Sequence, residues 1–182
     1  MSDIMLDSET LGTRPGCVVL SIGAVAFGPK GLLDDGFYIV VNRHSCEVLG
    51  LHTAKSTLDW WSQQSREAQQ VLLEADLPDR SHNLTEALAK FDEYVEKHGG
   101  KQVRMWGNGA DFDNPIIGEC YHAAGKPPRW GTYNNRCYRT LKNLLPTVRY
   151  KREGTHHNAL DDAKTQALHA VDLLNTLNAW ET

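Results

Sequence analysis

Two acidic residues, Asp7 and Glu9, follow directly on a short apolar run near the start of the chain. Side chains two residues apart on a strand share a face, so the two carboxylates are expected to converge if this run is a strand. Burial of a carboxylate is costly unless it is paired or bound to a cation, and the residues before Asp7 are Ile4, Met5 and Leu6. The pattern therefore indicates a pair of acids that needs a partner.

Two further acids lie beside or on predicted helices. Asp113, in WGNGADFDNPII, directly precedes a helix that Asn114 and Pro115 are expected to open, and Asp162 lies on the last predicted helix, in HHNALDDA. Carboxylate oxygens are the ligands that hard Mg²⁺ or Mn²⁺ ions require, and two such ions about 4 Å apart can stabilise an in-line phosphoryl displacement. Any one acid alone would be typical of a helix cap or a solvated charge. The joint order of the acids favours the metal site.

His157 stands five residues before Asp162. Five residues rotate by about 140° on an ideal helix, so the two side chains can meet only if His157 lies in the loop that enters the helix. From that loop a neutral imidazole could take the proton from an attacking water. An exposed histidine near a helix cap is the alternative interpretation, and His156 is the competing candidate for the base.

The hydrophobic periodicity predicts the elements that must position these residues. Strands are expected at 4–6, 18–27 and 37–41, as an antiparallel meander, and at 103–106. Helical spacing runs from 56 to 72 and from 84 to 95, and further helices are expected near 115–124, at 140–145 and from 160 to 174. No repeat or linker interrupts the pattern, so we expect one α/β domain over residues 1–182.

Composition excludes several classes of protein. The chain has 182 residues, 41% of them hydrophobic, which is enough for a sizeable core. Its longest apolar stretch, residues 17–27, is too short for a membrane span of about 20 residues, and the first ten residues carry no Lys or Arg. We therefore expect a soluble, cytoplasmic protein without a membrane partner. The cysteines have no CxxC spacing and are interpreted as reduced thiols: Cys17, Cys46, Cys120 and Cys137.

The charge is unevenly distributed along the chain. The net charge is −4, yet residues 126–152 carry eight basic residues and no acid, which leaves −12 (11 basic, 23 acidic) on the rest. Such a segment could bind phosphates while acids elsewhere hold metal, although a solvated basic loop is the simpler interpretation. Its basic members are Lys126, Arg129, Arg136, Arg139, Lys142, Arg149, Lys151 and Arg152.

Three motifs carry a resemblance to a known family. LDSET, NGADFDN and HNALDDA, in this order, resemble the three motifs of the DEDDh 3′-5′ exonuclease superfamily. Within it, residues 5–27 and the tracts TLDWWSQQS, WGNGADFDNP and YRTL are similar to the phage and prophage branch described as exodeoxyribonuclease VIII-like or RNase T-like. The resemblance implies an α/β, RNase H-like fold, a mixed five-stranded sheet flanked by helices.

The resemblance also implies a role for each residue of the site. Asp7 would bridge both metals, Glu9 and Asp162 would complete the metal site on the side of the nucleophile, and Asp113 would bind the other metal. His157 would be the general base.

Two positions depart from the family pattern or compete with it. Asp111 is a rival to Asp113, but the family places the ligand directly after the aromatic residue, here Phe112, so we choose Asp113. Cys137 stands where many relatives have an acid, so no substrate role is assigned to it.

Candidate substrate contacts lie around these motifs. Thr10 and Leu11 resemble family positions that contact the terminal nucleotide. Trp60 and Trp61 are about 100° apart on the predicted helix, so one is expected in the core and the other is a candidate to stack on a base; we assign Trp61 to the substrate. Three polar residues complete the set: Asn108, Arg136 and Arg139.

The function expected from the resemblance is a metal-dependent 3′-to-5′ exonuclease that releases nucleoside 5′-monophosphates from DNA, with RNA as the alternative. Its partners would be single-stranded nucleic acid or 3′ overhangs, and small size together with the related enzymes is compatible with a homodimer. A non-catalytic nucleic-acid-binding domain would usually lack a metal ligand, and an RNase H-type endonuclease is disfavoured by His157. A dinucleotide site at GNGADF is disfavoured because Phe112 occupies the third glycine position.

Overall fold

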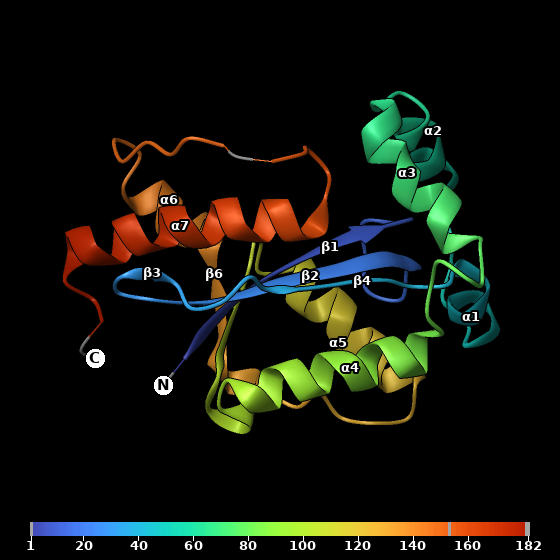
Figure 1. The fold of residues 1–182 in the computed structure, drawn as a ribbon, viewed down its shortest axis with the longest axis horizontal. Coiled ribbons are helices and arrows are strands. Elements are labelled where there is room, and N and C mark those ends of the chain that lie inside the picture. Colours follow the sequence, from blue (N-terminus) through green and yellow to red (C-terminus); the bar gives the residue numbers. More distant parts are fainter. Residues whose placement is uncertain (1, 153, 181–182) are drawn as a thin grey trace.

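The centre of the fold is a mixed sheet with the strand order β3-β2-β1-β5-β6, in which β4 also pairs with β2 (Figure 1). The computed structural model describes residues 2–152 and 154–180. Strand β1 runs antiparallel to β2 and parallel to β5, and β6 runs parallel to β5. The strands are β1 (Asp3–Thr10), β2 (Val19–Gly28), β3 (Gly31–Leu32), β4 (Phe37–Val40), β5 (Arg104–Gly107) and β6 (Asn135–Cys137).

Helices cover both faces of this sheet. Figure 1 shows α6 and α7 over one face, α4 and α5 over the other, and α2 and α3 beyond the carboxyl end of β1. The α-helices are α1 (Arg43–Val48), α2 (Lys55–Trp61), α3 (Arg66–Ala75), α4 (Leu84–Lys97), α5 (Asp113–Ala123), α6 (Tyr138–Leu144) and α7 (Ala159–Leu177), and short 3-10 turns cover η1 (Gly100–Gln102) and η2 (Thr132–Asn134). Among the described residues, none of the helices is long and apolar enough to cross a membrane.

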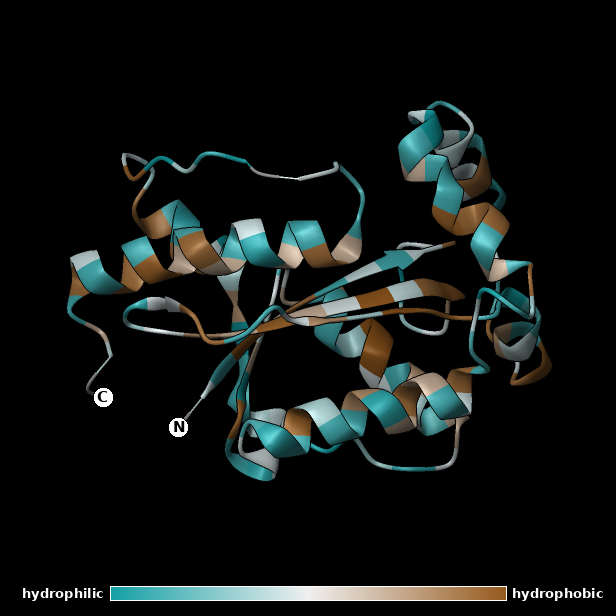
Figure 2. Cartoon of the chain, viewed as in Figure 1, coloured by the Kyte–Doolittle hydropathy of each residue, from teal (hydrophilic) through white to brown (hydrophobic). Residues whose placement is uncertain are grey.

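The two faces of the sheet have separate hydrophobic cores. On one face Ile4 and Leu6 of β1 pack with residues of α4 and α5, and on the other Met5 packs with residues of α6 and α7. Strand β2 is buried along its whole length, and Figure 2 shows it as largely hydrophobic, whereas α4 and α7 alternate between hydrophobic and hydrophilic turns. The alternation along β1 therefore sends even-numbered residues toward one helical layer and odd-numbered ones toward the other.

The structure corrects three expectations about these elements. The helical pattern from 56 to 72 is two helices, because the side chain of Ser65 accepts a hydrogen bond from the Ala68 N–H at 3.2 Å and begins α3 anew. The sheet has six strands rather than five, since β3 and β4 are separate pieces on β2 and β6 adds an edge. Helix α1 and strand β6 were not predicted, because neither has enough apolar residues to show a period.

A glycine on β2 sets the position of α7. Gly23 pairs with Asp7 in the β1–β2 register, and a Cβ added at Gly23 would clash with the backbone of Ala159 and Leu160. The first turn of α7 can therefore lie directly on the sheet beside Asp7 only because this residue has no side chain. This contact brings Asp162, in the same turn, to the end of β1.

We expect Gly23→Ala to lower the free energy of unfolding by about 1–3 kcal/mol, because the new methyl group overpacks a backbone contact that cannot yield locally. Chemical denaturation followed by circular dichroism measures this. The control is Gly118→Ala on α5, where an added Cβ meets nothing within 4 Å and alanine is favoured in a helix. Equal stability of the Gly23→Ala variant and the wild type would contradict the assigned role of Gly23.

Candidate active site

A cavity of about 610 Å³ opens at the carboxyl end of β1, between α7 and α2. Strand β1 contributes Asp7 and Glu9 to its wall, α7 contributes Asp162, and the loop before α7 contributes His157. Asp113, the first residue of α5, is buried and close enough to raise the pKa values of Asp7 and Glu9 through its charge. The five residues singled out in the three motifs therefore meet at one place.

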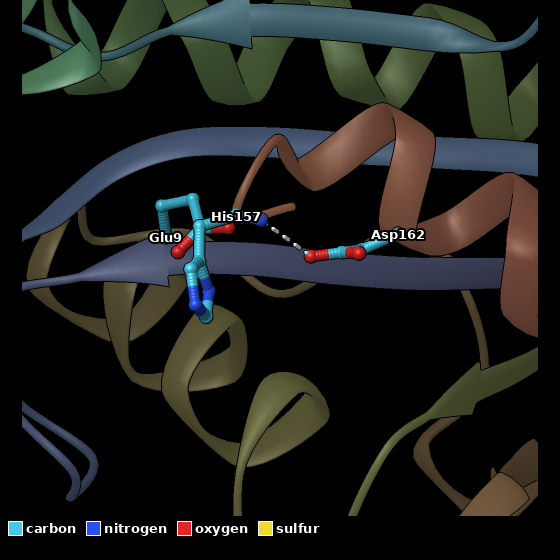
Figure 3. A group of neighbouring side chains, drawn as sticks. All are labelled: Glu9, His157 and Asp162. Carbon is cyan, nitrogen blue, oxygen red and sulfur yellow. Dashed lines mark hydrogen bonds between the residues drawn. The ribbon is translucent and has the colours of Figure 1, made fainter. Parts of the chain in front are cut away.

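Three of these side chains form a compact group (Figure 3). Glu9, His157 and Asp162 each offer one ligand atom, and these atoms all lie within 4.8 Å of one another. The backbone N–H of His157 also donates a hydrogen bond to Oδ2 of Asp162 at 3.2 Å, drawn as the dashed line in Figure 3. Two carboxylates and an imidazole at this spacing are a donor set suited to a divalent cation.

The carboxylate of Asp113 is held by three donors. Its Oδ1 accepts hydrogen bonds from the N–H and the hydroxyl of Ser8, at 3.1 and 2.9 Å, and its Oδ2 accepts from the N–H of Asn108 at 2.9 Å. Asp111 is exposed, whereas Asp113 is buried. The geometry therefore favours Asp113 over Asp111 as the acid that joins Asp7, Glu9 and Asp162.

Gln166 is a residue of the site that sequence reasoning missed. Its Nε2 donates a hydrogen bond to Oδ1 of Asp7 at 2.7 Å. Gln166 lies four residues after Asp162 on α7, so the two share a helix face, and this spacing was the signal available in the sequence. The contact fixes the orientation of the Asp7 carboxylate across the space between α7 and the sheet.

Burial raises the pKa values of the three acids on β1 and α5, and neighbouring negative charge adds to the shift at two of them. Burial raises the pKa of Asp7 well above its ordinary value, and the charges of Asp113 and Glu9 raise it further. Burial, with a contribution from Asp113, raises the pKa of Glu9 to about 7. Burial also raises the pKa of Asp113 to about 6 although the donors on Asn108 and Ser8 oppose the shift. The charge of Arg152 opposes the shifts at Asp7 and Glu9 without cancelling them, and divalent cations are the further partners that these oxygens fit.

His157 lies in the loop before α7, as the spacing to Asp162 required. Its φ of 62° is in the left-handed region, and the next residue, Asn158, caps α7 by accepting hydrogen bonds from two backbone N–H groups at 3.1 Å. The imidazole packs edge-on against Trp60, with ring centroids 4.9 Å apart. Burial, followed by the charges of His156 and Arg152, lowers the pKa of His157, so its ring is neutral at pH 7.

Comparison with known proteins identifies the family. Residues 2–174 match the model of the Rv2179c-like 3′-5′ exoribonuclease domain. The chain belongs to this family. An exodeoxyribonuclease of Enterobacteria phage T4 is 28% identical over 126 residues, which cover 64% of this chain and 54% of the phage protein. The chain thus spans about half the length of that curated relative.

Solved nuclease structures share the fold of this family member. The nuclease domain of 3′hExo, a DEDDh family member bound to rAMP, is 16% identical with a TM-score of 0.63, over 99% of this chain and 94% of that one. E. coli Exonuclease I with a dA16 oligonucleotide is 13% identical with a TM-score of 0.62, over 96% of this chain and 41% of that one. Exonuclease X with 5′ overhanging duplex DNA is 14% identical with a TM-score of 0.60, over 97% and 93%. The RNase H-like fold and the resemblance to DEDDh exonucleases are confirmed.

The two adjacent tryptophans differ in burial, and the order is the reverse of the one that our assignment of Trp61 to the substrate implies. Trp61 borders the cavity but is 1% exposed, and its Nε1 donates a hydrogen bond to the carbonyl of Thr10 at 2.9 Å, which holds the end of β1. Trp60 is 41% exposed and lines the same cavity. Trp61 is therefore the core member of the pair, and Trp60 is the ring that a ligand can reach.

The other candidate substrate contacts are only partly gathered at the cavity. Thr10 and Asn108 line it. Leu11 is fully buried and does not line the cavity. Arg136 and Arg139 are exposed and do not line it either. Arg139 instead donates a hydrogen bond to the carbonyl of Asn108 at 2.6 Å, and so supports the turn that presents Asn108 to Asp113.

The fold divides the basic segment of residues 126–152. Lys126 pairs with Asp92 at 2.9 Å and Arg129 with Glu96 at 3.0 Å, both on α4 across the sheet from α7. Lys142 and Arg152 line the cavity. The basic residues therefore do not all face one surface, because the folded segment crosses from one helical layer to the other, and only part of the segment is at hand to bind phosphates in the cavity.

Glu9→Gln is expected to stabilise the metal-free protein at pH 8 by about 1–3 kcal/mol and to have little effect near pH 5. The pKa of Glu9 is about 7 in the folded protein and near 4.5 without burial, so the folded state binds this proton more tightly. Ionised Glu9 therefore opposes folding above about pH 7, and this cost disappears as the pH falls toward 4.5. Urea denaturation in EDTA measures the difference, with the exposed Glu93→Gln as control. An effect of equal size at both pH values would contradict this explanation.

Proposed function

We propose that this chain is a metal-dependent 3′-5′ exonuclease that removes nucleoside 5′-monophosphates from the 3′ end of a single strand. The meeting of three carboxylates and a neutral histidine in one cavity, with the buried carboxylate of Asp113 beside them, carries the proposal. A non-catalytic binding domain on this fold would have no use for so many grouped acids, whose pKa values are raised by burial. Membership of a family of 3′-5′ exoribonuclease domains supports the direction of attack.

The carboxylates are proposed to hold two ions, Mg²⁺ or Mn²⁺. Glu9 and Asp162 would bind one, Asp113 would bind the other, and Asp7 would contact both. When bound, such ions stabilise the charge that develops on the phosphoryl group and favour ionisation of a water molecule. The protein's own part is to hold the ligands in place: Ser8 fixes Asp113, and Gln166 fixes Asp7.

His157 is proposed as the general base. Its pKa lies below the ordinary value, so at pH 7 one ring nitrogen is free to accept a proton from water at the cavity. The rings of Trp60 and His156 pack against the imidazole, with centroids 4.9 and 4.0 Å away, and limit its movement.

Trp60 is proposed as the platform for a terminal base. An exposed indole beside the catalytic residues offers a face on which any base can stack, and stacking tolerates all four bases. Thr10 and Asn108 supply polar groups at the same cavity for contacts to the sugar and phosphate. A base can lie on this ring only when it is unpaired, which favours single strands and overhangs.

DNA is proposed as the substrate, with RNA as the second candidate. The phage relative is named an exodeoxyribonuclease, whereas the matching family model is described as an exoribonuclease domain. Matched single-stranded DNA, single-stranded RNA and 3′-overhang duplexes, digested with Mg²⁺ or Mn²⁺ and resolved by mass, decide between them. We expect mononucleotides from the 3′ end of linear substrates only. Internal cleavage of circular single-stranded DNA would contradict the proposal, and so would binding of the linear strands without any cleavage.

Replacement of any of the four acids by alanine is expected to reduce turnover by at least about 10³-fold, because a lost ligand removes charge stabilisation from the transition state. The variants are Asp7→Ala, Glu9→Ala, Asp113→Ala and Asp162→Ala, assayed on a labelled oligonucleotide. The matched control is Asp111→Ala, which removes an exposed acid two residues from Asp113 and should keep activity. An active Asp113→Ala with an inactive Asp111→Ala would move the ligand to Asp111.

His157→Ala is expected to reduce turnover by about 10²- to 10⁴-fold, the usual range for a proton-transfer group. His156→Ala is the control, because His156 lines the same cavity but lies outside the group formed by Glu9, His157 and Asp162. Single-turnover rates at saturating metal separate the chemical step from product release. The reverse order of the two variants would assign the base to His156.

A further inference from the structure

Residues 148–150, which precede His157 in the chain, are held against α7. The Nε2–H of His169, on α7, donates a hydrogen bond to the carbonyl of Val148 at 3.0 Å, so Nδ1 accepts from the hydroxyl of Tyr138 at 2.7 Å. The ring of Tyr150 stacks on the same imidazole, with centroids 4.7 Å apart and an interplanar angle of 28°. These contacts anchor the chain two residues before Arg152.

Arg152 extends from this anchor into the carboxylate group. Its Nη2 donates a hydrogen bond to Oδ1 of Asp162, and its side chain lines the cavity. Its Nε is buried and has no hydrogen-bond partner within the part of the chain that the structure describes. The guanidinium carries five donors in a fixed fork, so it has donors left for a ligand of the cavity.

The contact with Asp162 is weakened when that carboxylate also serves as a metal ligand. A guanidinium and a divalent cation on one small carboxylate repel each other in a partly buried site, where screening by solvent is weak. The side chain of Asp162 is 12% exposed and that of Arg152 is 33% exposed, so Arg152 has room to move toward the cavity. A phosphate there is the anion whose geometry fits its fork.

We propose that Arg152 exchanges partners during the reaction: it neutralises Asp162 before metal binds and then donates to a phosphate of the bound strand. This inference rests on the proposed function, and it names a substrate-contacting residue that the three motifs do not contain. Lys142 lines the same cavity, forms no ion pair among the described residues, and supplies a second positive charge for the strand. The two cations differ in one respect, since Arg152 touches a carboxylate of the group and Lys142 does not.

Metal affinity in the absence of nucleic acid tests the first half of the exchange. Calorimetric titration with Mn²⁺ should show about three- to tenfold tighter binding to Arg152→Gln than to the wild type, because a competing cation has been removed. Lys142→Gln should bind Mn²⁺ as the wild type does. Arg152→Lys, which keeps the charge but loses the fork, should lie between them, and circular dichroism confirms that each variant is folded.

Substrate kinetics at saturating metal test the second half. Arg152→Gln and Lys142→Gln should each raise KM for a single-stranded oligonucleotide several-fold. Each should also make KM less dependent on salt concentration, by about the amount expected for the loss of one phosphate contact. Provided that the wild type cleaves, either of two results overturns the proposed exchange of partners. One is Mn²⁺ binding by Arg152→Gln that is unchanged or weaker, and the other is an unchanged KM of this variant. If the wild type releases no mononucleotides at all, the proposed function fails instead, and the two failures are thereby distinguished.

Discussion

Repulsion among buried carboxylates is the constraint on which the arrangement of this site depends. Burial raises the pKa of each of Asp7, Glu9 and Asp113 above its ordinary value, and neighbouring negative charge adds to the shift at Asp7 and Glu9. A fold selected for stability alone would separate or neutralise them. The donors that converge on Asp113 and the amide that holds Asp7 orient the charges and leave them grouped, as a site for divalent cations requires.

The acids are held together mainly by contacts that position the backbone of the elements carrying them. Gly23 allows the first turn of α7 to rest on β2 beside Asp7, and the Asn158 cap fixes where that turn begins. The indole of Trp61 holds the end of β1 through the carbonyl of Thr10, next to Glu9. The acids therefore meet because three rigid elements end or begin at the same edge of the sheet, and the neutral His157 enters from the loop between them.

The sequence predicted that the acids of the three motifs lie together, but it did not predict the residues that support them. Asp7 and Glu9 could be placed because alternation along a strand is local, and the loop position of His157 followed from its five-residue spacing to Asp162. The buried member of the Trp60 and Trp61 pair could not be chosen, since helix geometry gives their separation but not the direction of the core. The partners of Arg139, Arg152 and Gln166 depend on chain segments brought together only by folding, and β6 is too short and polar to show a period. The division of the basic segment between two layers is a tertiary feature of the same kind.

Anomalous diffraction from crystals soaked in Mn²⁺ tests whether these carboxylates form one metal centre. We expect anomalous peaks at the carboxylate of Asp7, with Glu9 and Asp162 around one ion and Asp113 beside the other, and loss of these peaks in crystals of Asp7→Ala. Mn²⁺ bound only to exposed acids, with the cavity at the end of β1 free of anomalous density, would contradict this expectation.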